Sequence, residues 1–193
     1  MRIVRAAALV SVLGLAACAS YTAIDAAAPV PVGDNVLVSP QINWGKAPFP
    51  GFTGELWTED GMRLDSLMFF TGIAPGKALI DASGVSKTEM KVYQAGMVPD
   101  DVMELLSSNF SKLGYQQVHA SNLRPAPFGP VGGFRFDLTF STVDGLNMKG
   151  MALAAQRDGK LDLILFIAPT EYYYDHYSPT VEKIFGSVQV AGK

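Results

Sequence analysis

The stretch Phe134-Arg135-Phe136-Asp137-Leu138-Thr139-Phe140-Ser141 alternates large apolar and polar side chains over eight residues. Successive side chains of a β-strand point to opposite faces, so this alternation predicts a strand with one apolar and one polar face. The pair Asp144-Gly145 follows it. Asp-Gly is typical of turns between antiparallel strands, because glycine accepts the positive φ that such turns require. This stretch therefore predicts an antiparallel sheet.

Two further Asp-Gly pairs, Asp60-Gly61 and Asp158-Gly159, predict two further hairpins. The segments that they join are 54–58 with 62–70 and 146–157 with 160–168. In the last of these segments Leu161, Leu163, Leu165 and Ile167 lie two residues apart, so they share one face of a strand. Three consecutive antiparallel strands are therefore expected over residues 134–168.

Two helices are expected beside these strands. The first runs from Pro99, which is favourable in a first turn, to Leu113, and Gly114 ends it. Its apolar stripe consists of Val102, Leu105, Leu106, Phe110 and Leu113. The second is predicted to begin after Ser178 as the N-cap and to end near Phe185, before a short strand over 187–190. The order of strands and helices predicts an α+β fold, an antiparallel β-sheet with two helices packed on it.

The N-terminus has the pattern of a secretory signal peptide. Arg2 and Arg5 precede an uncharged run over residues 6–15, which is too short for a comfortable membrane span of about twenty residues. An uncleaved anchor or a buried helix is the alternative. The residues Leu15-Ala16-Ala17-Cys18 resemble the bacterial lipobox, which is a leucine, two small residues and a cysteine.

The lipobox resemblance implies cleavage before Cys18 and a diacylglyceryl group on its sulfur, so membrane lipid is the first expected partner. Ala19, in place of an aspartate, permits sorting to the outer membrane. We thus expect a signal peptide over 1–17, a lipidated cysteine with an Ala/Pro-rich tether over 18–33, and one periplasmic domain over 34–193. As a flexible coil the tether would reach roughly 20 Å. The alternative is that part of it forms an edge strand.

The composition excludes several kinds of function. Removal of residues 1–17, which contain two arginines, changes the formal net charge from −3 to −5, and no run of Lys and Arg occurs. Nucleic acid is therefore not an expected partner. Cys18 is the only cysteine, so once acylated it leaves no thiol for catalysis, disulfides or metal binding. With only two histidines, His119 and His176, no metal site and no cofactor are predicted.

The densest candidate for an interaction surface is the segment Thr170–Pro179. It contains four tyrosines and one histidine, namely Tyr172, Tyr173, Tyr174, His176 and Tyr177. Exposed aromatic rings stack on sugars, and tyrosine is enriched at membrane interfaces. The alternative is a loop whose tyrosines cover the edge of the core. Phe49 and Phe128, each in a proline-rich Ala-Pro-Phe stretch, are expected to add an apolar docking rim or to fold inward.

The order of elements over residues 34–190 resembles the PsbP/Mog fold family. The closing helix, which ends in Phe185-Gly186-Ser187-Val188, is part of this resemblance. Its members, among them some bacterial envelope lipoproteins, act mostly as binding or assembly factors. The fold does not settle the function; we expect a non-enzymatic envelope lipoprotein that binds another envelope component, such as a protein, through exposed loops or assists assembly. Alternatives are a carrier of a small apolar ligand and, third, a hydrolase that uses His176 with Asp175 or Glu171.

Overall fold

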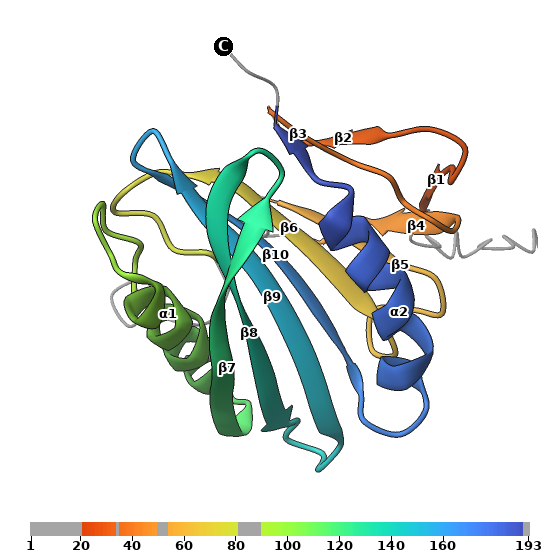
Figure 1. Cartoon of the computed structure of the whole chain (residues 1–193). Helices are drawn as coiled ribbons and strands as arrows, with labels where there is room; N and C mark the ends of the chain where they lie inside the picture. Colours follow the sequence, from red (N-terminus) through yellow and green to blue (C-terminus); the bar gives the residue numbers. More distant parts are fainter. Residues whose placement is uncertain (1–20, 34, 50–53, 81–89, 191–193) are drawn as a thin grey trace, which may run out of the picture.

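The fold is an α+β arrangement of a curved antiparallel sheet with one helix on each face (Figure 1). The computed structural model describes residues 21–33, 35–49, 54–80 and 90–190. Eight strands form the main sheet in the order β1-β4-β5-β6-β10-β9-β8-β7, and a smaller sheet has the order β11-β3-β2. The elements are β1 (Thr22–Ile24), β2 (Val30–Val32), β3 (Val36–Val38), β4 (Trp44–Ala47), β5 (Glu55–Thr58), β6 (Ser66–Ile73), α1 (Pro99–Lys112), β7 (Gln116–Phe128), β8 (Val131–Ser141), β9 (Asn147–Arg157), β10 (Lys160–Pro169), α2 (Tyr173–Gly186) and β11 (Gln189–Val190).

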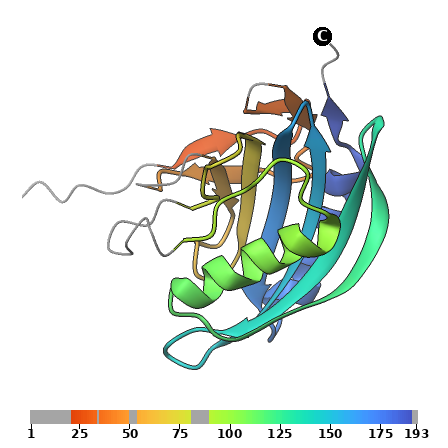
Figure 2. The same ribbon diagram turned by 90° about the vertical axis from the view of Figure 1, so that its left-hand side faces the viewer.

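The α1 face of the sheet carries the alternating apolar residues that the sequence predicted. Phe136 and Leu138 of β8 and Leu163 of β10 are buried in one core cluster with Leu106 and Phe110 of α1. Figure 2 shows α1 lying across this face. The predicted hairpins between β8, β9 and β10 are confirmed, and β8 pairs with β9 from Phe134 opposite Ala154 to Ser141 opposite Asn147.

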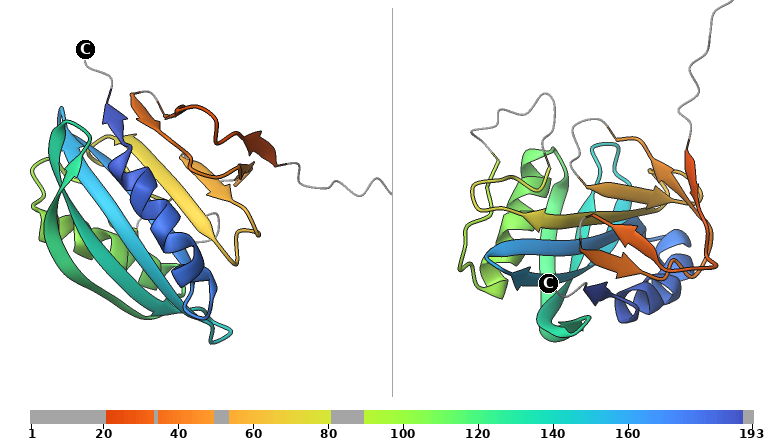
Figure 3. Two further views of the ribbon diagram at one scale, coloured as in Figure 1. Left: turned by 45° about the vertical axis from the view of Figure 1, so that its right-hand side comes forward. Right: turned by 90° about the horizontal axis from the view of Figure 1, so that it is seen from above.

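The α2 face forms a second core. Val181 and Ile184 of α2 are buried with Ile164 and Phe166 of β10 and with the strand β3. Figure 3 shows α2 against this face, with β2, β3 and β11 beside it. The predicted strand after the last helix is confirmed, because Gln189 and Val190 form β11 and pair with β3.

The first helix begins and ends as the sequence predicted, at Pro99 and beside Leu113. The Asp101 side chain accepts a hydrogen bond from the Val98 backbone N–H at 3.0 Å, so it satisfies one donor of the first turn. The side chain of Asn109 is fully buried and bonds both the backbone N–H and the carbonyl of Lys91, at 2.9 and 3.1 Å. These bonds attach the chain before α1 to the helix.

The predicted start of the second helix at Ser178 is wrong. Helix α2 begins at Tyr173, five residues earlier, and Pro179 lies inside it. Proline lacks the N–H that would bond the carbonyl four residues before it, so one bond of this helix is lost. The buried residues Tyr177, Val181 and Ile184 lie four and three residues apart, so burial of one continuous stripe outweighs that lost bond.

Only one predicted Asp-Gly hairpin is a two-residue turn. Asp158 and Gly159 have φ of 50° and 73° and join β9 directly to β10. The expected strand over 62–70 instead starts at Ser66, because residues 59–65 form a longer turn around Asp65. The buried Asp65 carboxylate accepts bonds from the Thr58 hydroxyl and from two backbone N–H groups, at 2.7 to 2.9 Å.

Most of the proline-rich stretch 124–130, which contains Phe128, is strand although prolines are typical of loops. Pro125 and Pro127 lie in β7, paired with Phe134 and Gly132 of β8. Because β7 is the last strand of the main sheet, a proline there costs no bond to a second neighbour. The turn comes later, at Gly129, whose φ is 59°.

The flexible tether predicted for residues 19–33 is wrong from residue 21 onward. Thr22–Ile24 form β1, which pairs with β4, and Val30–Val32 form β2, which pairs with β3. Val32 is fully buried in the core of the α2 face. Burial of these side chains offsets the entropy of ordering the segment. The expected signal peptide over 1–17 and the expected lipidation of Cys18 lie outside the described residues.

Candidate functional site

The predicted aromatic segment starts with a strained turn. The Tyr173 backbone N–H donates to the Glu171 carbonyl at 2.9 Å, across Tyr172, which has φ 69° and ψ −61°. This is a γ-turn with a positive central φ, a rare and strained conformation for a residue other than glycine. The turn holds the Tyr172 side chain outward, with 65% of its surface exposed, directly before α2.

Three rings of this segment form a surface group that we call the aromatic cluster, consisting of Tyr172, Tyr173 and His176. The Tyr172 ring stacks on the His176 ring, with centroids 5.1 Å apart and planes at 14°. The Tyr173 ring meets Tyr172 edge-on at 5.2 Å and 87°. Aromatic pairs favour both arrangements, so the half-buried Tyr173 ring and the exposed rings of Tyr172 and His176 stabilise one another's positions.

Two of the predicted surface tyrosines are instead anchors of α2. Tyr177 is only 4% exposed, its ring lies 5.9 Å from Trp44, and its hydroxyl donates to Oδ2 of Asp60 at 2.7 Å. Burial, with the bond to Asp60, raises the pKa of Tyr177. Tyr173 lies four residues before Tyr177 and shares its face of α2, so the half-buried Tyr173 packs against the core that contains Tyr177.

Tyr174 is half-buried between the sheet and solvent. Its ring stacks on Phe166 at 5.9 Å, and the Lys149 ammonium lies 5.5 Å from its centre. Burial raises the pKa of Tyr174 to about 12. Tyr174 is therefore a packing residue at the margin of the aromatic cluster.

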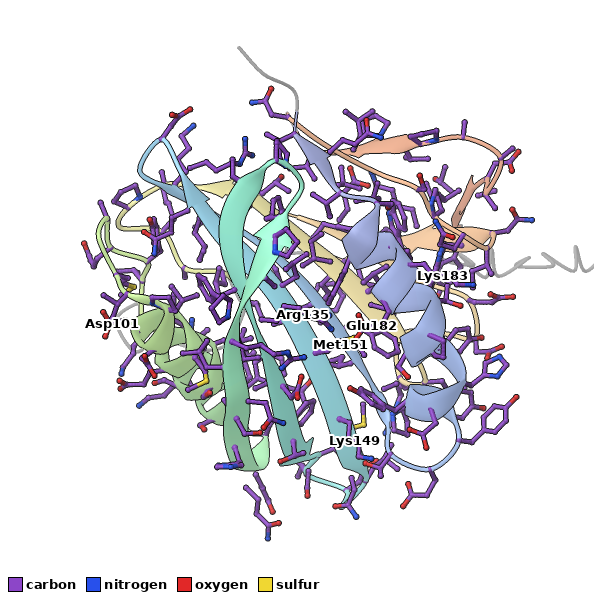
Figure 4. The ribbon with its side chains drawn as sticks, in the orientation of Figure 1. Asp101, Arg135, Lys149, Met151, Glu182 and Lys183 are labelled. Carbon is purple, nitrogen blue, oxygen red and sulfur yellow. The ribbon has the colours of Figure 1, made fainter. Side chains whose placement is uncertain are left out.

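An ion pair fixes α2 to β8 on the same face. Arg135 of β8 and Glu182 of α2 point toward each other (Figure 4) and form two hydrogen bonds, of 2.7 and 2.5 Å. The Arg135 guanidinium also lies 5.1 Å from the Phe185 ring centre. The hydrogen bonds to Glu182 raise the pKa of Arg135. The sequence offered no signal for this pair, because its members are 47 residues apart.

The aromatic cluster is bordered by acidic side chains. Glu171 and Asp175 are both exposed. Within the described part of the chain, neither carboxylate has a Lys, Arg or His nitrogen within ion-pair distance. The cluster thus presents apolar ring faces beside two carboxylates that remain in water.

A continuous series of contacts links the aromatic cluster to the first described strand. Tyr177 meets His176 at 4.7 Å and Trp44 at 5.9 Å, and Trp44 pairs with Ile24 of β1. β1 and the first turn of α2 accordingly lie on the same side of the molecule in Figures 1 and 3. The cluster therefore has a fixed position relative to the start of the fold.

The two predicted docking phenylalanines do not form one surface. Phe128 is fully buried at the end of β7, in the core of the α2 face, so of the two alternatives it folds inward. Phe49, which follows β4, is 46% exposed. Buried Phe128 packs with the C-terminal part of the chain, where a Cβ on Gly129 would lie 2.8 Å from the Val188 carbonyl.

The apolar-carrier alternative needs a pocket between the sheet and the helices. The space on the α1 face is filled by buried side chains such as Tyr93, Leu105 and Phe140. A hollow of about 300 Å³ lies beside α1. Its lining is half charged: Lys91, Val92, Met97, Asp101, Glu104 and Leu105. Lys91 and Glu104 also pair at 2.5 Å, so this hollow does not match an apolar ligand.

The hydrolase alternative relies on His176, whose ring contacts Tyr172 and Tyr177. No described serine hydroxyl bonds this imidazole, so no nucleophile–base pair is formed there. Among residues 21–33, 35–49, 54–80 and 90–190, no group of three or more His, Cys, Asp or Glu side chains could hold a metal ion. No helix in those ranges is both long enough and apolar enough to cross a membrane.

No protein-family model matches the chain, and no curated protein matches its sequence. Among solved structures, the chain is similar to the cyanobacterial PsbP protein, CyanoP, of Synechocystis sp. PCC 6803. The TM-score is 0.54 and the identity 15%, over 94% of this chain and 98% of that one. It also matches LpqN of Mycobacterium tuberculosis, described as involved in cell envelope biogenesis, with a TM-score of 0.40 and 10% identity over 92% and 88% of the two chains. The likeness to CyanoP concerns the fold alone, and it shows that this chain has a PsbP-like fold.

Proposed function

We propose that this protein is a lipid-anchored cell-envelope protein with a non-catalytic binding role. Acylated Cys18 would hold it in a membrane, and the aromatic cluster would bind another component of the envelope. Because Ala19 follows the cysteine, the proposed location is the outer membrane, with the domain facing the periplasm. Two or three acyl chains are enough for stable attachment without a membrane-spanning helix.

The strained γ-turn at Tyr172 is the observation that carries the binding role. A positive φ at a residue other than glycine costs on the order of 1–3 kcal/mol, and such strain concentrates at binding and catalytic sites. Burial of the side chain does not offset this strain, since the Tyr172 ring is 65% exposed. An exposed ring fixed by neighbouring rings loses little entropy when it binds, which favours an interaction surface.

Affinity capture tests this proposal. The acylated protein would be recovered from gently solubilised envelopes, and co-purifying proteins and lipids would be identified by mass spectrometry. Tyr172→Ala and His176→Ala should lose a component that the wild type retains. Val143→Ala is the matched control, because Val143 is 76% exposed in the turn between β8 and β9. Identical recovery with all four proteins would overturn the binding role.

A further inference from the structure

We propose that the aromatic cluster rests on the headgroup layer of the membrane that holds acylated Cys18. This inference rests on the proposed lipid anchor and identifies the component that the cluster contacts. It follows from the length of chain between the cysteine and the fold, from the contacts that link β1 to the cluster, and from the chemistry of the exposed rings.

The chain between Cys18 and the fold is short. Tyr21 is the first described residue, and β1 begins at Thr22. Three residue steps of at most about 3.6 Å each place the Tyr21 Cα within about 11 Å of the Cys18 Cα. With its acyl chains in the bilayer, Cys18 lies at the membrane surface. The edge strand β1 must therefore lie beside that surface, and a 20 Å tether does not separate the two.

The rest of the fold follows β1 because β1 is fixed to it. Three residues of β1 pair with β4, from Thr22 opposite Lys46 to Ile24 opposite Trp44. Trp44 is 3% exposed and packs against Tyr177, which in turn contacts His176 of the aromatic cluster. One buried tryptophan and one buried tyrosine thus connect the first strand to the cluster by direct contacts.

The exposed side chains on this side of the molecule suit a membrane interface. Tyr172 and Tyr21 are 65% and 48% exposed. A tyrosine ring is apolar and its hydroxyl is polar, which is why tyrosine is enriched where headgroups meet the acyl region. The exposed carboxylates of Glu171 and Asp175 favour water, so they limit the contact to the headgroup layer.

Site-directed labelling tests this orientation. Acylation leaves no free thiol in the wild-type chain, so each introduced cysteine is the single labelling site. Glu171→Cys places a bimane fluorophore beside the aromatic cluster. His119→Cys places it on β7, the strand at the opposite edge of the sheet from β1. Each acylated protein would be reconstituted in phosphatidylcholine vesicles that contain lipid with a nitroxide on its headgroup.

The label at position 171 should lose most of its emission to the headgroup nitroxide, and the label at position 119 should keep its emission. Addition of Tyr172→Ala and His176→Ala should weaken the quenching at position 171, whereas Val143→Ala should leave it unchanged. Equal emission at positions 171 and 119 would overturn the inference. A label at position 171 that stays unquenched on vesicles but becomes protected from solvent in native envelopes would also overturn the inference. The contact would then be with another macromolecule.

The wild-type chain, which has no introduced cysteine, distinguishes a failure of this inference from a failure of the proposed anchor. Bimane uptake by the wild-type chain would show a free Cys18 thiol, which contradicts the lipid anchor itself. An unlabelled wild type with an unquenched label at position 171 would contradict only the orientation.

Discussion

The hydroxyl of Tyr177 in α2 donates a 2.7 Å hydrogen bond to the Asp60 carboxylate, 117 residues earlier in the chain. Asp60 lies in the turn between β5 and β6, which the buried Asp65 carboxylate closes from inside. One bond therefore joins the β5–β6 hairpin to the last helix, directly beneath the aromatic cluster.

Tyr177→Phe removes that hydroxyl and keeps the ring. A hydrogen bond to a charged acceptor contributes more than a neutral one, so the free energy of unfolding should fall by about 2 kcal/mol. Urea unfolding of the mature chain measures the change, with Tyr172→Phe as the control because the Tyr172 ring is exposed. An unchanged urea midpoint for Tyr177→Phe would mean that the bond does not stabilise the fold.

Tyr172→Gly and Tyr172→Ala separate backbone strain from ring contacts. Both variants lose the contacts of the Tyr172 ring, but only glycine adopts a positive φ without a steric penalty. The glycine variant should therefore be more stable than the alanine variant by about 1 kcal/mol. Thermal and urea unfolding of the two variants make the comparison. Equal stability, or a more stable alanine variant, would contradict the γ-turn.

The Arg135–Glu182 pair should stabilise the attachment of α2 to β8. Glu182→Gln leaves the largely buried Arg135 without its charged partner, and the free energy of unfolding should fall by about 1 kcal/mol, since the Glu182 carboxylate is partly screened by solvent. The difference should shrink at high salt. Lys183→Gln, at the next position of the same helix, is the control. Equal effects of the two substitutions would show that the ion pair is not the cause.

Alkaline pH should destabilise the fold through Tyr174. Its pKa is raised to about 12 in the folded protein, above the unfolded value of 10.0, because burial favours the neutral phenol. The stabilisation from this group is fully present below pH 10 and is lost as the pH rises from 10 through 12. Tyr174→Phe should make the decline in the urea midpoint over that window less steep, and Tyr172→Phe should not. If the urea midpoint of Tyr174→Phe declined as steeply as that of the wild type, Tyr174 would not be the cause of the alkaline destabilisation.

The sequence predicted the elements whose signals are local. The alternation in 134–141, the apolar face of 161–167 and the pair Asp158-Gly159 act within a few residues, and all appear in the structure as expected. Helix α1 has a proline at its start, a glycine after its end and one apolar stripe, so its bounds were also predictable.

The sequence-based predictions failed where residues far apart in the chain determine the local structure. Residues 22–24 and 30–32 resemble a linker in composition and become strands only because β4 and β3 pair with them. Pro179 suggested a helix start, but the buried stripe that extends back to Tyr177 outweighs it. The prolines of β7 are tolerated because of that strand's place at the sheet edge, which only the assembled sheet defines.

The candidate site remains a prediction, and the sequence did not separate its exposed members from its buried ones. The segment 170–179 contains the aromatic cluster, but no local pattern distinguishes exposed Tyr172 from buried Tyr177. Their difference depends on Trp44 and Asp60, which contact Tyr177 and both come from the first third of the chain. The sequence left Phe128 between a docking rim and an inward position, because its burial depends on distant residues in the core of the α2 face.

The intact mass of the protein extracted from membranes tests the central claim most directly. A lipid-anchored envelope protein predicts a mature chain that begins at Cys18 and carries a diacylglyceryl group with a further acyl chain. Cys18→Ser should remove that mass and release the chain from the membrane fraction. A membrane-extracted chain that retains residues 1–17, or one with an unmodified Cys18, would contradict the claim.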